Sequence, residues 1–92
     1  MRDVAMSDEF FARCKEGILS LDSSGFYDEE ENEEGCWIRC EAHTDRWFDE
    51  LSFSLEAIDE YGKHCRVDKE QYNDIYDTYI GVLQERRYQW TD

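Results

Sequence analysis

The sequence predicts an α+β domain that is mostly helical, built from one helix, an acidic-tipped β-hairpin and two further helices. Apolar residues recur at helical spacing in three stretches of the chain, and a two-residue alternation marks the segment after the first of them. The 92 residues suffice for one small domain, residues 1–92, with a modest core. Aromatic residues make up 15% of the chain, which is typical of a folded domain rather than a disordered acidic segment.

The first helix is expected at residues 8–21. Ser7 suits the N-cap position, and Asp8 and Glu9 fall in the first turn, where the helix dipole favours negative charge. The Ser-Ser-Gly sequence at 23–25 ends this helix. Its core-facing stripe, with spacings of four, four and three residues, consists of Phe10, Cys14, Ile18 and Leu21.

Residues 26–41 are predicted to form a β-hairpin. Cys36, Ile38 and Cys40 occupy alternate positions, which is the period of a strand with one face buried. The sequence DEEENEEG, residues 28–35, is interpreted as the connection between the two strands. The hairpin therefore carries a strongly acidic loop at its tip.

Trp37 and Arg39 fall on the opposite side of that second strand. If the cysteines face the core, this tryptophan and arginine face outward beside the acidic loop, where they would form an interface anchor. Alternatively, Trp37 covers the second face of the hairpin beneath a helix.

Residues 45–61 are expected to form the second helix, capped by Thr44 and Gly62. The sequence ELSFSLE also alternates like a strand, which leaves a second architecture open. If residues 49–56 are a strand, the chain forms a three-stranded antiparallel sheet flanked by the first and last helices. The helical interpretation places more apolar residues on one face, namely Trp47, Phe48, Leu51, Leu55, Ile58 and Tyr61.

The last helix is predicted to begin after Asp68. Asp68 and Gln71 have the spacing of a capping box, and Val67 is placed to pack against Tyr72 as a hydrophobic staple. Basic residues 86–87 fall in the last turns, where the helix dipole favours cations. One face of this helix carries Tyr72, Ile75, Tyr76, Tyr79, Leu83 and Trp90.

The net charge of −14 limits the classes of partner. With 24 acidic against 10 basic residues, direct binding to nucleic acid or to an anionic membrane is not expected, because both need clustered Lys and Arg. The expected partner is basic. No apolar run is long enough to span a membrane, and the N-terminus lacks the apolar segment of a signal peptide, so a cytoplasmic protein with reduced cysteines is expected.

The sequence predicts neither a metal site nor an enzyme. Cys36, Cys40 and His43 do not have a common zinc spacing, and two thiols on one face of a strand four residues apart lie about 13 Å from each other. The acidic loop fits no EF-hand register. The chain contains no phosphate-binding loop or nucleophile elbow, and buried apolar cysteines are the expected state. No cofactor is predicted.

The carboxylates lie one turn apart on the predicted helices, where like charges repel by a few tenths of a kcal/mol per pair. Few have a basic residue one turn away, which suggests that the charge itself is used. The residues predicted to bind a partner are the clustered acids and one tryptophan: Asp28, Glu29, Glu30, Glu31, Glu33, Glu34, Trp37, Asp45, Asp49, Glu56, Asp59, Glu60, Glu70, Asp74 and Asp77.

In size, charge and aromatic content the chain resembles the small acidic DNA-mimic proteins encoded by phages, including anti-CRISPR and anti-restriction proteins. This resemblance implies a non-enzymatic inhibitor in the host cytoplasm, which blocks substrate binding by a basic nucleic-acid-binding protein or nuclease complex. Three alternatives remain open: an immunity protein that neutralises a basic nuclease toxin, a protein-interaction adaptor whose acidity is incidental, and a metal-binding domain.

Overall fold

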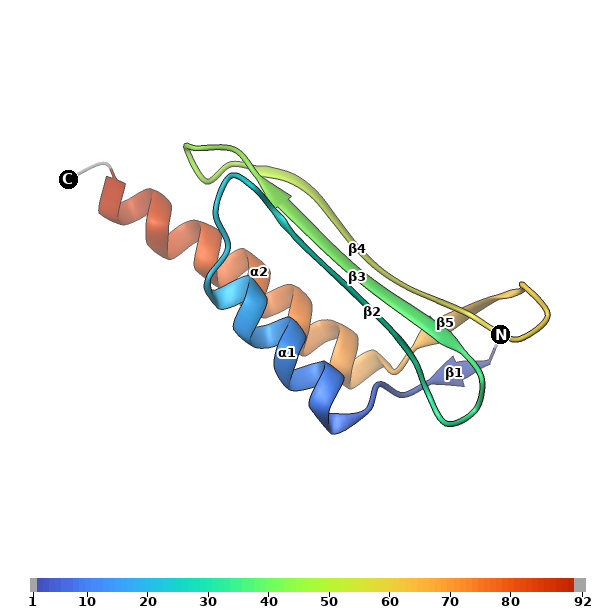
Figure 1. Ribbon diagram of the computed structural model, residues 1–92. Helices are drawn as coiled ribbons and strands as arrows, with labels where there is room; N and C mark the ends of the chain where they lie inside the picture. The colour runs from blue at the N-terminus through green and yellow to red at the C-terminus, as the bar shows by residue number, and fades with distance from the viewer. Residues whose placement is uncertain (1, 91–92) are drawn as a thin grey trace.

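Two parallel helices cover one face of a five-stranded, half-barrel sheet (Figure 1). The computed structural model describes residues 2–90, with the side chains of all but 50 and 88–90. The sheet order is β1-β5-β4-β3-β2, and only the β1–β5 pair is parallel. In chain order the elements are β1 (Asp3–Val4), α1 (Asp8–Leu19), β2 (Phe26–Glu31), β3 (Trp37–Thr44), β4 (Glu50–Ile58), β5 (His64–Val67) and α2 (Lys69–Trp90).

The prediction of a mostly helical domain is wrong, because the segment 45–61 contains a long strand and two turns instead of a helix. β4 pairs along most of its length with β3. Phe53, Leu55 and Ala57 point toward the helices, and the residues between them point to solvent. Pairing with β3 satisfies the backbone groups of this segment, so tertiary context outweighs its helical apolar pattern.

The proposed caps of that helix have other roles. Thr44 is buried at the end of β3, and its Oγ1 donates to the Asp49 carbonyl at 2.8 Å. Gly62 lies in the turn between β4 and β5 with a φ of 80°, which favours glycine. The three-stranded alternative is also incorrect, because β5 and β1 extend the sheet to five strands. Both are too short, at four and two residues, to give a periodic signal.

The first helix matches its predicted start. The Phe10 N–H donates to Ser7 Oγ at 3.1 Å, so Ser7 is the N-cap. The helix ends at Leu19, two residues earlier than predicted, and its core-facing residues Phe10, Cys14 and Ile18 are fully buried.

The hairpin formed by β2 and β3 confirms the predicted alternation but not the length of the loop. Residues 28–31 belong to β2, so the connection is confined to residues 32–36. Asn32 closes it, because its Oδ1 accepts hydrogen bonds from the backbone N–H groups of Glu34 and Cys36. Cross-strand pairing therefore orders the first half of the acidic sequence as an edge strand.

The last helix begins where the sequence predicts, with Asp68 Oδ2 accepting from the Gln71 N–H at 3.1 Å. The Gln71 side chain binds both backbone groups of Met6, so it fixes the chain between β1 and α1. The predicted core position of Trp90 lies outside the side chains that the structure describes.

The core lies between the two helices and the covered face of the sheet. Phe53 contributes to it from β4 and contacts the rings of Tyr72, Tyr76 and Tyr79 on α2. Cys14, Cys36, Cys40 and Cys65 are buried and free. Burial follows the predicted strand alternation for Cys36 and Cys40 and the predicted helical stripe for Cys14. Within residues 2–90, neither helix combines the length and the apolar character needed to span a membrane.

Candidate functional site

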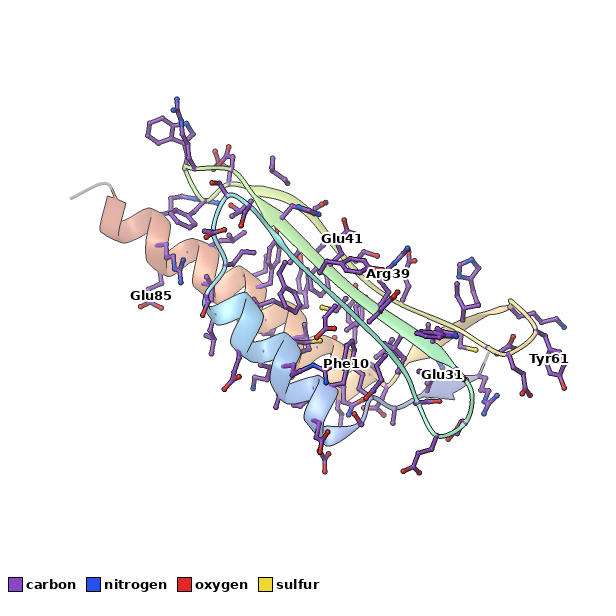
Figure 2. The ribbon with its side chains drawn as sticks, in the orientation of Figure 1. Phe10, Glu31, Arg39, Glu41, Tyr61 and Glu85 are labelled. Carbon is purple, nitrogen blue, oxygen red and sulfur yellow. The ribbon has the colours of Figure 1, made fainter. Side chains whose placement is uncertain are left out.

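The sheet face opposite the helices has no covering element within residues 2–90. Side chains alternate between the two faces along each strand, so every second residue of β2–β5 points to solvent. Figure 2 shows Glu31, Arg39 and Glu41 on the strands, with Phe10 and Glu85 on the helices. We call this surface the open face; it consists of Tyr27, Glu29, Glu31, Trp37, Arg39, Glu41, His43, Ser52, Ser54, Glu56, Ile58, His64 and Arg66.

The register of the sheet places these side chains in rows across the strands. In one row Trp37 lies between Glu31 on β2 and Ile58 on β4. In the next row Arg39 lies between Glu29 and Glu56. Directly opposed residues have Cβ atoms about 5 Å apart, so each row is a set of contacting side chains.

Hydrogen bonds fix the second row. Arg39 Nη2 donates to Glu56 Oε2 at 2.8 Å, and this bond raises the pKa of the guanidinium. Tyr27 donates its hydroxyl to Glu29 Oε2 at 2.8 Å. That bond to a carboxylate raises the pKa of the Tyr27 phenol, because the ionised phenolate would lose the bond and face a like charge.

A small hollow lies between the two rows. It has a volume of about 110 Å³ and is lined by Glu29, Trp37, Arg39, Glu56 and Ile58. The indole and the isoleucine give it an apolar side, and the two carboxylates with the arginine give it a polar side. We call it the Trp37 hollow.

Trp37 supplies much of the exposed apolar surface of the open face. Its side chain is 49% exposed, and Ile58 beside it on β4 is 36% exposed. Tyr27, two rows away on the same face, is 54% exposed. Of the two placements that the sequence allowed for Trp37, the structure shows the outward one.

His43 lies on this face beside Glu41 and Gly25. Its Nε2 lies 2.7 Å from Glu41 Oε1, and a Cβ at Gly25 would lie 2.6 Å from its Nδ1. Nε2 therefore has a carboxylate neighbour, Nδ1 lies close to the backbone of Gly25, and His43 lines neither of the hollows described in this section.

The predicted partner-binding acids do not form one continuous site. Glu29, Glu31 and Glu56 are brought together on the open face beside Trp37. Two of the acids in the sequence DEEENEEG, Asp28 and Glu30, point instead toward α1. Arg13 Nε donates to Asp28 Oδ2 at 2.9 Å, and Ser7 Oγ donates to Glu30 Oε1 at 2.6 Å, so both attach α1 to the edge strand.

A second group of predicted acids lies at the end of the molecule where the β2–β3 and β4–β5 turns meet. Glu60 Oε2 is 3.6 Å from the position of a Cβ at Gly35, which places the two turns side by side. Asp59 stabilises its own turn by accepting from the N–H groups of Tyr61 and Lys63, each at 2.9 Å. We call this group the acidic tip; it contains Glu33, Glu34, Asp59 and Glu60.

Asp45 and Asp49 lie in the β3–β4 turn. Asp45 Oδ1 accepts from the N–H groups of Trp47 and Asp49, and Asp49 lies 3.5 Å from Arg87 of α2. These carboxylates hold a turn in which Phe48 has a φ of 60°, which is uncommon for an aromatic residue. Both carboxylates therefore contribute to the structure of this turn.

Glu70, Asp74 and Asp77 form an exposed row on α2. Asp74 accepts from Lys15 Nζ of α1 at 3.1 Å, which joins the two helices at their surface. This row confirms the predicted placement of the three acids on one solvent-facing side of the last helix.

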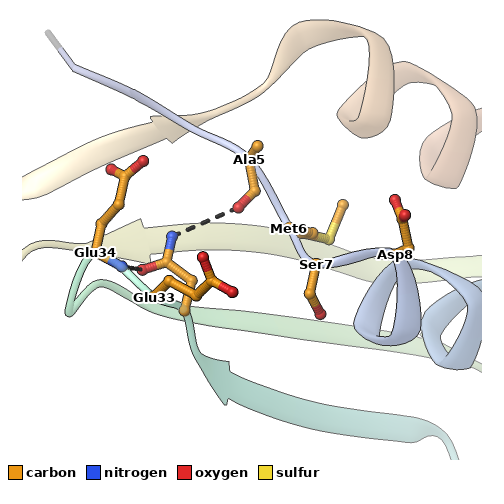
Figure 3. A pocket seen from close by; sticks show the side chains of 7 residues that line it. Ala5, Met6, Ser7, Asp8, Glu33 and Glu34 are labelled. Carbon is orange, nitrogen blue, oxygen red and sulfur yellow. Dashed lines mark hydrogen bonds between the residues drawn. The ribbon is translucent and has the colours of Figure 1, made fainter.

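A larger hollow of about 410 Å³ lies at the start of α1 (Figure 3). Its lining includes Ser7 and the carboxylates of Asp8, Glu33 and Glu34. Arg2 forms an ion pair with Glu34 near this hollow. The lining contains no histidine, cysteine, lysine or arginine, so its charged groups are all carboxylates.

Within residues 2–90, no three His, Cys, Asp or Glu side chains are grouped as a metal site would require. Cys36 and Cys40 point into the core, and His43 points to the open face.

Sequence reasoning missed several residues of the open face, among them Tyr27, Glu41 and Ile58. The alternation that identified Trp37 and Arg39 extends to Glu41. The alternative interpretation of 49–56 as a strand includes Glu56 but ends before Ile58, which the observed β4 contains. The helical assignment of 45–61 concealed this relationship. Comparisons of the chain with protein-family models, curated proteins and solved structures give no match.

Proposed function

We propose that this protein is a non-enzymatic inhibitor that presents carboxylates as a nucleic-acid mimic to a basic nucleic-acid-binding protein, in the manner of anti-CRISPR or anti-restriction proteins. The observation that carries the proposal is the linear density of negative charge. The molecule is 48 × 20 × 20 Å, and its net charge of −14 along the long axis corresponds to about one charge per 3.4 Å. One strand of a DNA duplex carries phosphates at about that interval along the axis.

The local spacing of carboxylates supports the same proposal. Glu29 and Glu31 occupy alternate positions of a strand and are therefore about 6.6 Å apart along it. Glu70 and Asp74 are separated by about 6 Å along α2. The straight-line distance between neighbouring phosphates of one nucleic-acid strand is similar, roughly 6–7 Å, and it exceeds their spacing along the axis because the strand winds around that axis. A groove lined by Lys and Arg at phosphate spacing could therefore engage these acids.

The ion pairs within the chain neutralise only part of its negative charge, so many carboxylates remain for a partner. Arg2, Arg13, Lys15, Arg39 and Arg66 each pair with a carboxylate of the chain. Basic residues are outnumbered by 24 to 10, so most carboxylates cannot have a basic partner of their own. Association with a basic groove would be fast and salt-dependent, and the bound inhibitor would exclude the substrate by occupying its site.

The test is affinity capture from nuclease-rich lysate with the immobilised chain, at low and high salt, with and without competing duplex DNA. The proposal expects a basic nucleic-acid-binding protein that both salt and DNA release. The purified partner should then lose DNA binding when the chain is added. The charge itself is tested with a variant in which Glu31, Glu60, Glu70 and Asp77 are changed to their amides. This variant should compete with DNA for the partner much less well than the unchanged chain.

A partner that resists both salt and DNA would contradict the proposal. That result would favour an adaptor that uses the exposed aromatic residues, because apolar interfaces depend weakly on ionic strength. A basic toxin that does not bind through its nucleic-acid site would instead identify an immunity protein. In both cases the chain would fail to compete with DNA.

A further inference from the structure

We infer that the open face is the surface that receives the basic partner, and that the Trp37 hollow binds an arginine side chain of that partner. The inference rests on the proposed function, because it specifies where and by which chemistry the same partner is recognised. It separates the open face from the acidic row of α2, beside which the apolar residues point into the core, and from the acidic tip, where the exposed Tyr61 lines neither of the hollows described above.

On the open face, exposed apolar groups and carboxylates line the same hollow. Trp37, half exposed, is flanked by Glu31 and Ile58, and the next row supplies Glu29 and Glu56. On α2, by contrast, the apolar residues near the acidic row point into the core. Tryptophan and arginine are the residue types most enriched at the energetic centres of protein interfaces.

The carboxylates beside the hollow retain capacity to accept hydrogen bonds. Glu29 uses Oε2 for the Tyr27 hydroxyl, and Glu56 uses Oε2 for Arg39. Within the described part of the chain, no residue donates a hydrogen bond to the other oxygen, Oε1, of either carboxylate. These oxygens belong to strands on either side of β3, about 10 Å apart from strand to strand.

A guanidinium fits this arrangement better than an ammonium. It is planar, carries five N–H donors and is weakly hydrated, so it can lie against the Trp37 indole while donating to Glu29 or Glu56. A hollow of about 110 Å³ holds the end of one such side chain rather than a larger ligand. The chain itself shows a similar contact elsewhere, where the Arg46 guanidinium carbon lies 4.9 Å from the Trp47 ring centroid.

Charge favours a basic partner over a second copy of the chain on this face. The open face carries four glutamates against two arginines, so two copies would bring like charges together. Two copies are also not expected to pair through the edge strand β2. This strand is itself acidic, so two copies of it would repel each other. In addition, the Glu29 N–H already donates to Asp28 Oδ1 at 2.8 Å. The complementary occupant is a surface with exposed arginines.

The experiment uses two synthetic peptides, nona-arginine and nona-lysine, as probes of equal charge. Their affinities for the intact chain are measured by calorimetry, and the binding site is located by NMR of the labelled chain. The inference expects nona-arginine to bind about three-fold or more tightly than nona-lysine, since a guanidinium stacks on tryptophan. The largest shifts should be at the Trp37 indole N–H and along β3, rather than on α2.

Three pairs of variants separate the hollow from general charge attraction. Trp37→Ala should abolish the preference for arginine, whereas Tyr61→Ala, at a residue 81% exposed, should keep it.

The second pair tests the carboxylates. The double variant Glu29→Gln with Glu56→Gln should weaken the binding of nona-arginine more than Glu70→Gln with Asp77→Asn, which removes equal charge. Arg39→Gln should strengthen binding more than Lys15→Gln, because only Arg39 competes for the hollow. A thermal melt confirms that each variant is folded.

Two results would overturn the inference. Shifts centred on α2, or an arginine preference that persists in Trp37→Ala, would place binding elsewhere. A dimer in sedimentation that Trp37→Ala converts to a monomer would make the open face a contact between copies. If either occurs while the chain still displaces DNA from its captured partner, the proposed function stands and only the surface is wrong. If the chain displaces no DNA, the proposed function itself fails.

Discussion

Gly17 of α1 lies directly against the ring of Phe26 on β2. A Cβ at this position would be 2.1 Å from Cε2 of that ring, which is far closer than any real contact. The helix reaches this closely to the edge strand because residue 17 has no side chain. This contact, together with the Arg13–Asp28 pair, fixes the strand whose other face carries Glu29 and Glu31.

We therefore expect Gly17→Ala to destabilise the protein, although alanine is the better helix former. The overpacking cost of about 1–3 kcal/mol exceeds the gain of about 1 kcal/mol in helix propensity. Gly81→Ala is the matched control, because Gly81 lies in α2 with nothing within 4 Å of its Cβ position. That variant should gain about 1 kcal/mol. Urea unfolding of both variants measures the difference, and equal stabilisation by both would refute the Gly17–Phe26 contact.

Tyr79 connects α2 to the sheet through its hydroxyl. The group is buried and donates to the carbonyls of His43 at 2.6 Å and Ser52 at 3.2 Å, beside the irregularity in the β3–β4 pairing. Tyr79→Phe should lower the free energy of unfolding by about 1–2 kcal/mol, because it leaves these carbonyls without that donor. Tyr72→Phe alters the same aromatic cluster and should change stability by less than about 0.5 kcal/mol. Denaturant unfolding measures both, and equal losses would argue against the role of the hydroxyl.

Arg86 closes the C-terminal end of α1. Its guanidinium donates to the carbonyl oxygens of Leu19 and Leu21, which lack partners within the helix. Arg86→Gln should cost about 1–2 kcal/mol of stability, since charged hydrogen bonds to these carbonyls are lost. Arg46→Gln removes the same charge from an exposed turn and serves as the control. If thermal unfolding showed the two variants to be equal, net charge alone would explain the effect.

The pKa of Tyr27 provides a direct test of the open face. Its hydroxyl donates to Glu29, so its pKa in the folded protein lies above the ordinary value of 10.0. A raised folded-state pKa means that the contribution to stability is complete below about pH 10 and is lost as the pH rises through the folded value. NMR titration of labelled tyrosine should place the pKa of Tyr27 above its ordinary value of 10.0. Glu29→Gln should lower the Tyr27 pKa toward 10.0, and a Tyr27 titration unaffected by this change would exclude the hydrogen bond.

The four cysteines should be unreactive in the folded protein. All are buried, and the pKa of Cys14 is raised by its interaction with Cys40 and by burial, which suppresses the reactive thiolate. A thiol-specific chromogenic reagent should therefore label the native chain very slowly at pH 8 and label four thiols in denaturant. Rapid labelling of one thiol in the native chain would show that the core opens locally at that position.

Local signals in the sequence determined the parts of the fold that depend on neighbouring residues. Ser7 and Asp68 identified the starts of both helices, because capping requires only the next few residues. The alternation around Cys40 correctly separated buried cysteines from outward Trp37 and Arg39. The acidic composition by itself led to the proposal of a basic partner, which charge alone can motivate.

Tertiary structure decided the segment 45–61 and, with it, the candidate site. Its apolar residues fit a helix and a strand, and the choice depends on pairing with β3, which lies elsewhere in the sequence. Only that pairing brings Glu56 beside Arg39 and Ile58 beside Trp37. Contacts between distant residues leave no periodic signal in the sequence. The acids could therefore be counted from the sequence, but the sequence could not show how they are divided among the open face, the acidic tip, α2 and structural roles.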